Sequence, residues 1–342
     1  MTIRGALVAI VLAGSCIAAP VSAESPVAAG YQEAVFSVSN IDAYQEFLQQ
    51  VAGWQVIASG PVDARMLSAW GLPAAASARE VLVGNPGTTR GYIRLIQFEG
   101  VEQVQIRSNA QSWDTGGWFD VNSRVRAMGQ TFDAFQSLGW QATSDPVTFS
   151  FGKFVVTEWL ARGPDGIVIA VIERIAPPLE GWPQLQKMSR IFNATQIVSD
   201  IDAARWFYFD VLGFEPYLTH ESASKEAGPN VLGIPHNLAT QIVRRVTIAS
   251  PAGDNEGSVE LLAFDGLTGA DFSARSVPPN LGILMLRFPV KDMNSFYARM
   301  QQHDVTVAFA PVTTEIKPYG NVRLMAVRGP DGVWIEFYEQ QQ

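Results

Sequence analysis

Arg162-Gly163-Pro164-Asp165-Gly166 is repeated without change at Arg328-Gly329-Pro330-Asp331-Gly332. Each copy lies between two apolar runs; Ile167-Val168-Ile169 follows the first and Val333-Trp334-Ile335 follows the second. Proline fixes one backbone angle of a turn, and glycine accepts the left-handed conformation, so each copy predicts a hairpin between two strands. The same turn at two distant places indicates internal duplication, and duplication constrains the fold.

The duplication extends over four segments, each of which reads as a strand, a helix and further strands. Three pairs of stretches match: Phe36–Asp42 with Thr195–Asp202, Gly71–Pro73 with Gly233–Pro235, and Val125–Leu138 with Val290–His303. The first segment predicts a strand over 34–38, a helix over 41–48 capped by Ser39 and Asn40, and strands over 81–83 and 92–96. The order of the segments predicts an N-terminal domain over 31–175, a linker over 176–187 and a C-terminal domain over 188–340.

The first 23 residues have the pattern of a secretory signal peptide. Arg4 precedes an apolar run, and Val21-Ser22-Ala23 has the small residues of a cleavage site. We therefore expect an exported protein, periplasmic or secreted; a retained anchor, or a lipoprotein attached through Cys16, is the alternative. Cys16 is the only cysteine, so the mature chain would contain no disulfide and no thiolate ligand.

Composition excludes some partners. The chain of 342 residues carries a net charge of −9, and removing residues 1–23, which hold one Arg and no acid, leaves 23 basic against 33 acidic residues, or −10. There is no basic run, so we expect neither nucleic-acid binding nor membrane insertion after signal cleavage. The expected partner is a small organic molecule, and a homodimer is left open.

Two stretches carry a resemblance to a known family: Val198–Asp202 continuing through Phe207–Phe214, and Gly329–Glu336. With four modules in order over about residues 31–340, the chain resembles the vicinal oxygen chelate superfamily, which includes glyoxalase I, extradiol dioxygenases and bleomycin-resistance proteins. The resemblance implies an α+β fold of four βαβββ modules that form two paired domains. In that fold, each pair of modules encloses a cup.

The resemblance also implies where metal ligands would lie, on the first and last strands of the modules in each cup. In the N-terminal half these positions hold Glu33, Arg94, Asp120 and Ala170. The permanent charge of Arg94 argues against a metal there. Arg94 would instead bind a substrate anion, with Glu33 or Asp120 as base, or form an internal salt bridge with one of these acids.

In the C-terminal half the projected positions hold Asn193, Glu260, Met285 and Glu336. Glu260, Glu336 and Asn193 would offer oxygen ligands to a divalent metal, although Met285 is a poor fourth ligand. Alternatively, Glu260 and Glu336 would share a proton and act as catalytic acid and base. A third interpretation pairs these acids with Arg244, Arg287 or Arg323. No cofactor is certain from the sequence.

Three further residues are candidates for ligand binding. Trp70 and Trp118 lie among small residues near the projected rim of the first cup, where they would wall an apolar pocket. His236 lies in the Gly-Ile-Pro loop, which would form a rim, although a solvated histidine is the simpler interpretation. Asn193, already named as a possible metal ligand, is also a candidate for binding the organic ligand.

The resulting hypothesis is an exported glyoxalase-like protein that binds a small organic molecule without the full metal site of the family. If it is an enzyme, lyase or isomerase chemistry through Glu33, Arg94 and Asp120, or through Glu260 and Glu336, is the expected type. The alternatives are a non-catalytic protein that sequesters a small molecule, and a metal-dependent extradiol dioxygenase.

Overall fold

The computed structural model describes residues 25–341. The predicted signal peptide and Cys16 lie outside this range, so export and lipid attachment stay predictions. Within the described residues, no helix has the length and apolar character needed to cross a membrane.

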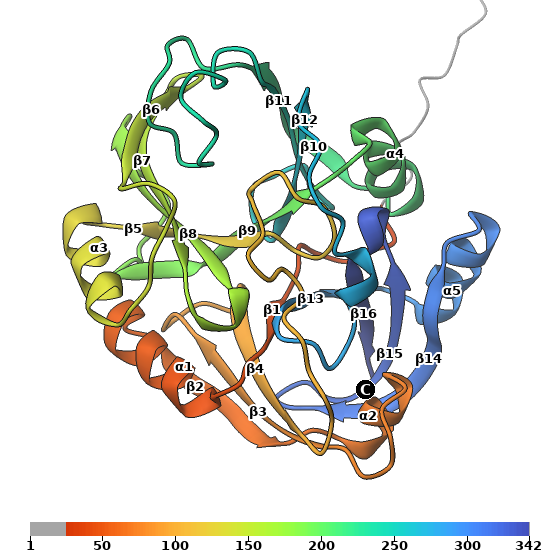
Figure 1. Ribbon diagram of the computed structural model, residues 1–342. Helices are drawn as coiled ribbons and strands as arrows, with labels where there is room; N and C mark the ends of the chain where they lie inside the picture. The colour runs from red at the N-terminus through yellow and green to blue at the C-terminus, as the bar shows by residue number, and fades with distance from the viewer. Residues whose placement is uncertain (1–24, 342) are drawn as a thin grey trace, which may run out of the picture.

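Four modules follow one another along the chain (Figure 1). The first contains β1 (Glu33–Ser37), α1 (Ile41–Phe47), η1 (Leu48–Ala52), β2 (Gln55–Pro61), α2 (Ala64–Ala69), β3 (Ser77–Gly84) and β4 (Tyr92–Glu99). The second contains β5 (Asp120–Val125), α3 (Met128–Ser137), β6 (Val147–Phe151), β7 (Phe154–Arg162), η2 (Pro164–Gly166) and β8 (Val168–Ala176).

The second half repeats this arrangement. The third module contains β9 (Met188–Ile197), α4 (Ile201–Trp206), η3 (Phe207–Val211), β10 (Glu215–Ser222), β11 (Val243–Ser250) and β12 (Ser258–Asp265). A short helix, η4 (Ser273–Arg275), leads to the fourth, which contains β13 (Gly282–Pro289), α5 (Met293–Gln302), β14 (Val307–Ile316), β15 (Gly320–Arg328), η5 (Pro330–Gly332) and β16 (Trp334–Gln340). The predicted α+β fold of repeated modules is confirmed.

The modules combine into two curled, eight-stranded sheets. Sheet 1 has the order β14-β15-β16-β13-β1-β4-β3-β2 and joins the first module to the fourth. Sheet 2 has the order β10-β11-β12-β9-β5-β8-β7-β6 and joins the second module to the third. The expectation that consecutive modules of one half share a cup is therefore wrong. The segment 177–187 connects β8 to β9, two strands of the same sheet.

Antiparallel pairs of central strands make these joins. In sheet 1, β1 pairs with β13, with Glu33 opposite Arg287. In sheet 2, β5 pairs with β9, with Asp120 opposite Thr195. Backbone groups make the hydrogen bonds of such a pair, so almost any two strands can form one. Similarity between modules consequently does not reveal which of them share a sheet.

The repeated turns lie where the two sheets meet. Asp165 and Asp331 both adopt a positive φ, of 58° and 47°, and each is followed by a glycine with positive φ. Asp165 Oδ2, in the second module, accepts from Ser39 N and Ser39 Oγ of the first module. Asp331 Oδ2, in the fourth, accepts from Ser199 N of the third. The hairpins are confirmed, and each turn also links one sheet to the other.

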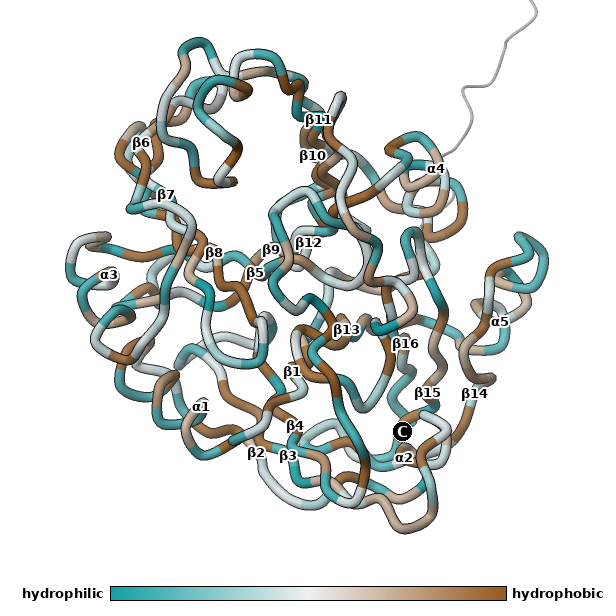
Figure 2. The backbone as a smooth tube through the Cα atoms, viewed as in Figure 1, coloured by the Kyte–Doolittle hydropathy of each residue, from teal (hydrophilic) through white to brown (hydrophobic). Residues whose placement is uncertain are grey.

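Alternation along the strands separates the two faces of each sheet. In β1, Ala34 and Phe36 belong to a large core shared by both sheets and their helices, whereas Val35 faces the inside of sheet 1. Figure 2 shows hydrophobic stretches interspersed with hydrophilic ones along the strands. The helix starts follow from capping: Asn40 Oδ1 accepts from Ala43 N, and Asp200 and Asp292 cap α4 and α5 in the same way.

Candidate functional site

Sheets 1 and 2 each curl around an interior, called cup 1 and cup 2 here, and the two interiors differ. Cup 1 is filled by side chains. The segment after β2 forms α2, which places Met66 and Trp70 into the interior core of sheet 1. Asp63, the capping residue of α2, accepts from Glu315 N of β14, so the helix is held against β14.

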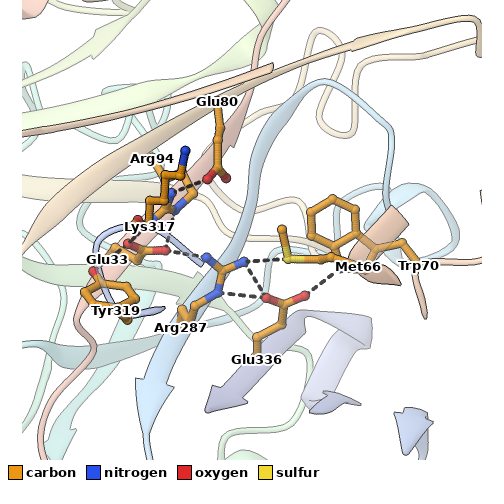
Figure 3. A network of polar contacts seen from close by, with 9 residues as sticks. All are labelled: Glu33, Met66, Trp70, Glu80, Arg94, Arg287, Lys317, Tyr319 and Glu336. Atoms are coloured by element: carbon orange, nitrogen blue, oxygen red, sulfur yellow. Dashed lines mark hydrogen bonds and ion pairs between the residues drawn. The ribbon is translucent and has the colours of Figure 1, made fainter. Parts of the chain in front are cut away.

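Cup 1 also contains a buried network of charged side chains (Figure 3). Arg94 donates from Nε to Glu33 Oε1 (2.7 Å) and from Nη2 to Glu33 Oε2 (2.9 Å). Arg287 contacts Glu33 and Glu336, with 2.6 Å between Nη2 and Glu336 Oε2. Glu33, Arg94, Arg287 and Glu336 are all completely buried. The predicted internal salt bridge of Arg94 is confirmed, with Glu33 as its partner.

Neutral groups complete the network. Tyr319 Oη donates to Glu33 Oε2 (2.7 Å), and Trp70 Nε1 donates to Glu336 Oε1 (2.6 Å). A third acid, Glu80, also belongs to the network, and its Oε1 lies 2.8 Å from Arg94 Nη1. Burial alone would raise the pKa of Glu33, but the charges of Arg94 and Arg287 outweigh it and lower the pKa from 4.5 to about 2. Glu33 is therefore ionised and paired, and it is not available as a base.

For Glu80 the balance is reversed: burial outweighs the charges of Arg94 and Arg287, so the pKa of Glu80 is raised. Three carboxyl groups here face two guanidinium groups, and Glu80 Oε2 is buried without a hydrogen-bond partner. Cup 1 thus has the properties of a structural ion cluster.

Cup 2 encloses a cavity of about 240 Å³. One wall comes from β7 and β8 of the second module and the other from β10 and β11 of the third. The loop between β10 and β11, teal in Figure 1, crosses between these walls. Leu232 of this loop lines the cavity and packs in a core with Phe119 and Leu160. Gly233 approaches Thr143 so closely that a Cβ there would lie 2.7 Å from Thr143 Oγ1.

Three carboxyl groups line this cavity, on three different strands: Asp120 on β5, Glu158 on β7 and Glu260 on β12. Glu260 lies beside Thr195 in β9, which in turn lies opposite Asp120, so these three residues form one row across sheet 2. Among residues 25–341, none of the three acids forms an ion pair.

The pKa values of these acids are raised. Burial raises the pKa of Asp120 to about 6, although hydrogen bonds from Thr195 act against this. Burial, and then the charge of Asp120, raise the pKa of Glu158 to about 8, and burial with Asp120 and Glu158 does the same for Glu260. At neutral pH the cavity holds both protonated and ionised carboxyl groups.

Amide side chains also line the cavity. Asn122 Nδ2 lies 3.1 Å from Asp120 Oδ1, 2.9 Å from Asn193 Oδ1 and 3.2 Å from Thr195 Oγ1. Asn193 in turn donates to Ser258 Oγ (2.9 Å). An amide donor thus occupies the space among the oxygens that a cation would take.

The residues present do not fit the metal site that the fold family implies. In cup 1, Arg94 and Arg287 hold the carboxylates that would bind a cation. In the described part of the chain, no group of three or more His, Cys, Asp or Glu side chains is placed to hold a metal ion. The suggested metal ligands Glu260, Glu336 and Asn193 do not come together, because Glu336 belongs to sheet 1 and the other two to sheet 2.

The structure also divides the two catalytic sets predicted from the sequence, because the members of each set lie in different sheets. Asp120 lies in sheet 2, apart from Glu33 and Arg94 in sheet 1, and Glu260 is likewise separated from Glu336. Asp120, Asn193 and Glu260 share cup 2, whereas Glu33, Arg94 and Glu336 share cup 1.

The aromatic and histidine candidates lie elsewhere than expected. Trp70 fills cup 1, and Trp118 is buried in the core between the sheets, where Nε1 donates to Trp334 O (3.1 Å). His236 is exposed and is not among the residues that line the cavity. His220 does line it, with Nε2 3.1 Å from Ser222 Oγ.

The interpretation that paired Glu336 with Arg287 is confirmed. Sequence reasoning missed two residues, Asn122 and Glu158. Asn122 lies two positions beyond the projected ligand position Asp120, and the period of two along a strand puts both on the same face, so this alternation would have identified it. Glu158 lies on β7, a strand that carries no projected position, and nothing in the sequence marks it.

Comparisons with known proteins agree with this architecture. Residues 190–337 match the profile described as the Glyoxalase/Bleomycin resistance protein/Dioxygenase superfamily. Comparison with curated protein sequences gives no significant match. Among solved structures, glyoxalase I from Zea mays is similar, with a TM-score of 0.58 and 13% identity over 92% of this chain and 93% of that one.

A putative dioxygenase from Bacillus subtilis is also similar, with a TM-score of 0.55 and 14% identity over 92% of this chain and 86% of that one. At such identities the likeness to solved structures concerns the fold. The family match assigns residues 190–337 to the glyoxalase/bleomycin resistance/dioxygenase, or vicinal oxygen chelate, superfamily, and the likeness to solved structures shows that the fold extends over 92% of the chain.

Proposed function

We propose that the protein binds a small organic molecule in cup 2 and converts it by proton transfer, as a lyase or isomerase would. The observation that carries this proposal is the contrast between the cups. Every acid of cup 1 is near an arginine, whereas Asp120, Glu158 and Glu260 line a cavity without an ion pair among the described residues. Unpaired acids with raised pKa values in a cavity are typical of a catalytic site.

The pKa values suggest a division of roles. Asp120, with a pKa of about 6, is largely ionised at neutral pH and is suited to accept a proton. Glu260 and Glu158, with pKa values of about 8, remain largely protonated and are suited to donate one. A ligand between these strands would meet a base and an acid in one site.

Binding can be tested with a panel of small aromatic and aliphatic acids, amides and ketones, using ligand-observed NMR. Val246 faces the cavity from β11, so Val246→Trp should fill it and abolish binding. The control is Val56→Trp on β2, because Val56 is 40% exposed and lies in sheet 1. Equal binding by wild type and Val246→Trp would refute the location of the site.

Conversion can be separated from sequestration with the same bound molecules. In D2O, proton transfer should exchange C–H bonds next to a carbonyl group for C–D bonds, and Glu260→Gln or Asp120→Asn should slow this by at least about 100-fold. Binding without exchange would favour a sequestering protein.

A further inference from the structure

Three arginines line cup 2 without forming an ion pair among the described residues; of these, Arg244 donates to Ser222 O and Ser224 Oγ, whereas Arg124 and Arg174 keep a donor without a partner. Arg124 on β5 and Arg174 on β8 both line the cavity, and neither forms an ion pair within residues 25–341. Arg124 is only 8% exposed. Its Nε and that of Arg174 are both buried without a hydrogen-bond partner. A buried guanidinium is normally paired, because leaving it unpaired is costly.

Strand register brings the two arginines together. Arg124 lies beside Ile172 in the parallel pair of β5 and β8, and Arg174 is two residues further along β8. A period of two places both side chains on the cavity face of sheet 2. Burial, and then the charge of Arg174, lower the pKa of Arg124 to about 10.

Aromatic rings support both guanidinium groups. The Cζ atom of Arg124 lies 4.3 Å from the ring centroid of Phe192, and that of Arg174 lies 4.0 Å from the ring centroid of Phe154. Such contacts orient a guanidinium without neutralising it, so its donors stay available.

The nearby groups do not replace a partner. Glu158 and Glu256 raise the pKa of Arg124 from a distance, together with Tyr217, but neither acid forms an ion pair with it. Glu256 pairs with Arg190 instead. The positive charge of this end of cup 2 is thus left for a molecule that enters the cavity.

We propose that Arg124 and Arg174 form an anion-binding subsite that selects an organic carboxylate with an aromatic or apolar body. This inference rests on the proposed function, since it assigns the class of molecule that cup 2 takes. The planar fork of an arginine matches a carboxylate, and Phe149, Phe154, Phe192 and Tyr217 supply apolar lining for the body of the ligand. Glu158 lies beside Ile172 on the strand next to β8, in the same row as Arg124. The bound carboxylate would therefore lie near an acid–base group.

The test compares 2-naphthoate with its neutral amide, 2-naphthamide, by calorimetry on the full chain. Wild type should bind the carboxylate at least about tenfold more tightly than the amide, since charge-assisted hydrogen bonds are about twice as strong as neutral ones. Arg124→Gln and Arg174→Gln should each weaken carboxylate binding by about 10- to 100-fold and leave amide binding nearly unchanged. Unchanged amide binding also shows that the variant cavity is intact.

The control is Arg245→Gln, because Arg245 lies on β11 but is paired with Asp265 and is absent from the cavity lining. It should leave both affinities as in wild type. Equal affinity of wild type for the two probes, or unchanged carboxylate binding in both variants, would overturn the subsite. If the amide binding is then still lost in Val246→Trp, the proposed function stands without the subsite. Failure of the carboxylate to bind at millimolar concentration also overturns the subsite, while the wider panel decides on cup 2.

Discussion

Replacing Arg287 with methionine should destabilise the protein strongly. Arg287 is completely buried and donates to Glu336 Oε2 from Nε (2.9 Å) and from Nη2 (2.6 Å), and it also contacts Glu33. Methionine keeps an apolar stem but removes the charge. Glu33, Glu80 and Glu336 would then share Arg94 as their only guanidinium in the network of Figure 3.

The size of the effect follows from two estimates. Removing one partner of a buried ion pair costs about 3–5 kcal/mol, because it leaves the other charge uncompensated. Separately, the fall in the pKa of Glu33 from 4.5 to about 2, which Arg94 and Arg287 cause, corresponds to about 3 kcal/mol. We therefore expect Arg287→Met to lower the free energy of unfolding by about 3 kcal/mol or more near neutral pH.

The cost should shrink in acid. In the wild type, the lowered pKa of Glu33 contributes stability that is fully present above pH 4.5 and is lost as the pH falls toward 2. In the variant, Glu33 and Glu336 lose a positive neighbour, so protonation relieves their repulsion. The difference in free energy of unfolding between variant and wild type should thus be smaller near about pH 4 than near about pH 7.

Urea unfolding followed by tryptophan fluorescence measures both effects. The matched control is Arg323→Met, because Arg323 is 27% exposed and lies 3.8 Å from Glu339. A surface pair of this kind contributes at most about 1 kcal/mol. An equal loss of stability in the two variants, or a loss that does not depend on pH, would refute the assignment of cup 1 as a buried ion cluster.

Two further predictions concern cup 2. The raised pKa of Glu260 means that the folded state keeps its proton between pH 4.5 and about 8 while the unfolded state loses it, so stability falls as the pH rises through this window. Glu260→Gln should hence be more stable than wild type by up to about 4 kcal/mol at about pH 8 and equal to it at about pH 4 in thermal unfolding. Gly233→Ala should cost more stability, by about 1 kcal/mol, than Gly71→Ala, because both glycines have a positive φ but only Gly233 would bring its Cβ against Thr143. Equal losses of stability in the two variants would show that the loop moves to accommodate the added Cβ, and would contradict this prediction.

Much of the local structure was predictable from particular residues. Asn40 caps the helix that it was expected to cap, and the two Arg-Gly-Pro-Asp-Gly stretches form the expected hairpins. The ion pair of Arg94 with Glu33 was one of the interpretations that the sequence left open. These features depend on side chains and backbone angles of neighbouring residues, or on one unusual charge at a buried strand position, so local sequence carries the information.

Which modules, and hence which side chains, form each cup was not predictable from local sequence. Glu33 meets Arg287 because β1 pairs with β13, and Asp120 meets Thr195 because β5 pairs with β9. The hydrogen bonds of these pairs come from the backbone, which is alike in all strands. The filling of cup 1 by Met66 and Trp70 depends on α2, a helix too short for its apolar pattern to be distinctive.

The sequence by itself determined that the protein consists of four repeated strand–helix–strand modules, because each module carries its own capping residues, apolar periodicity and turns. The tertiary structure alone decided that the first module pairs with the fourth and the second with the third. That pairing placed the acids of cup 1 next to arginines. It left the acids of cup 2 around a cavity, without an ion pair among the described residues. The physical reason is that pairing between distant strands is a property of the assembled backbone and of shape, which no short stretch of sequence encodes.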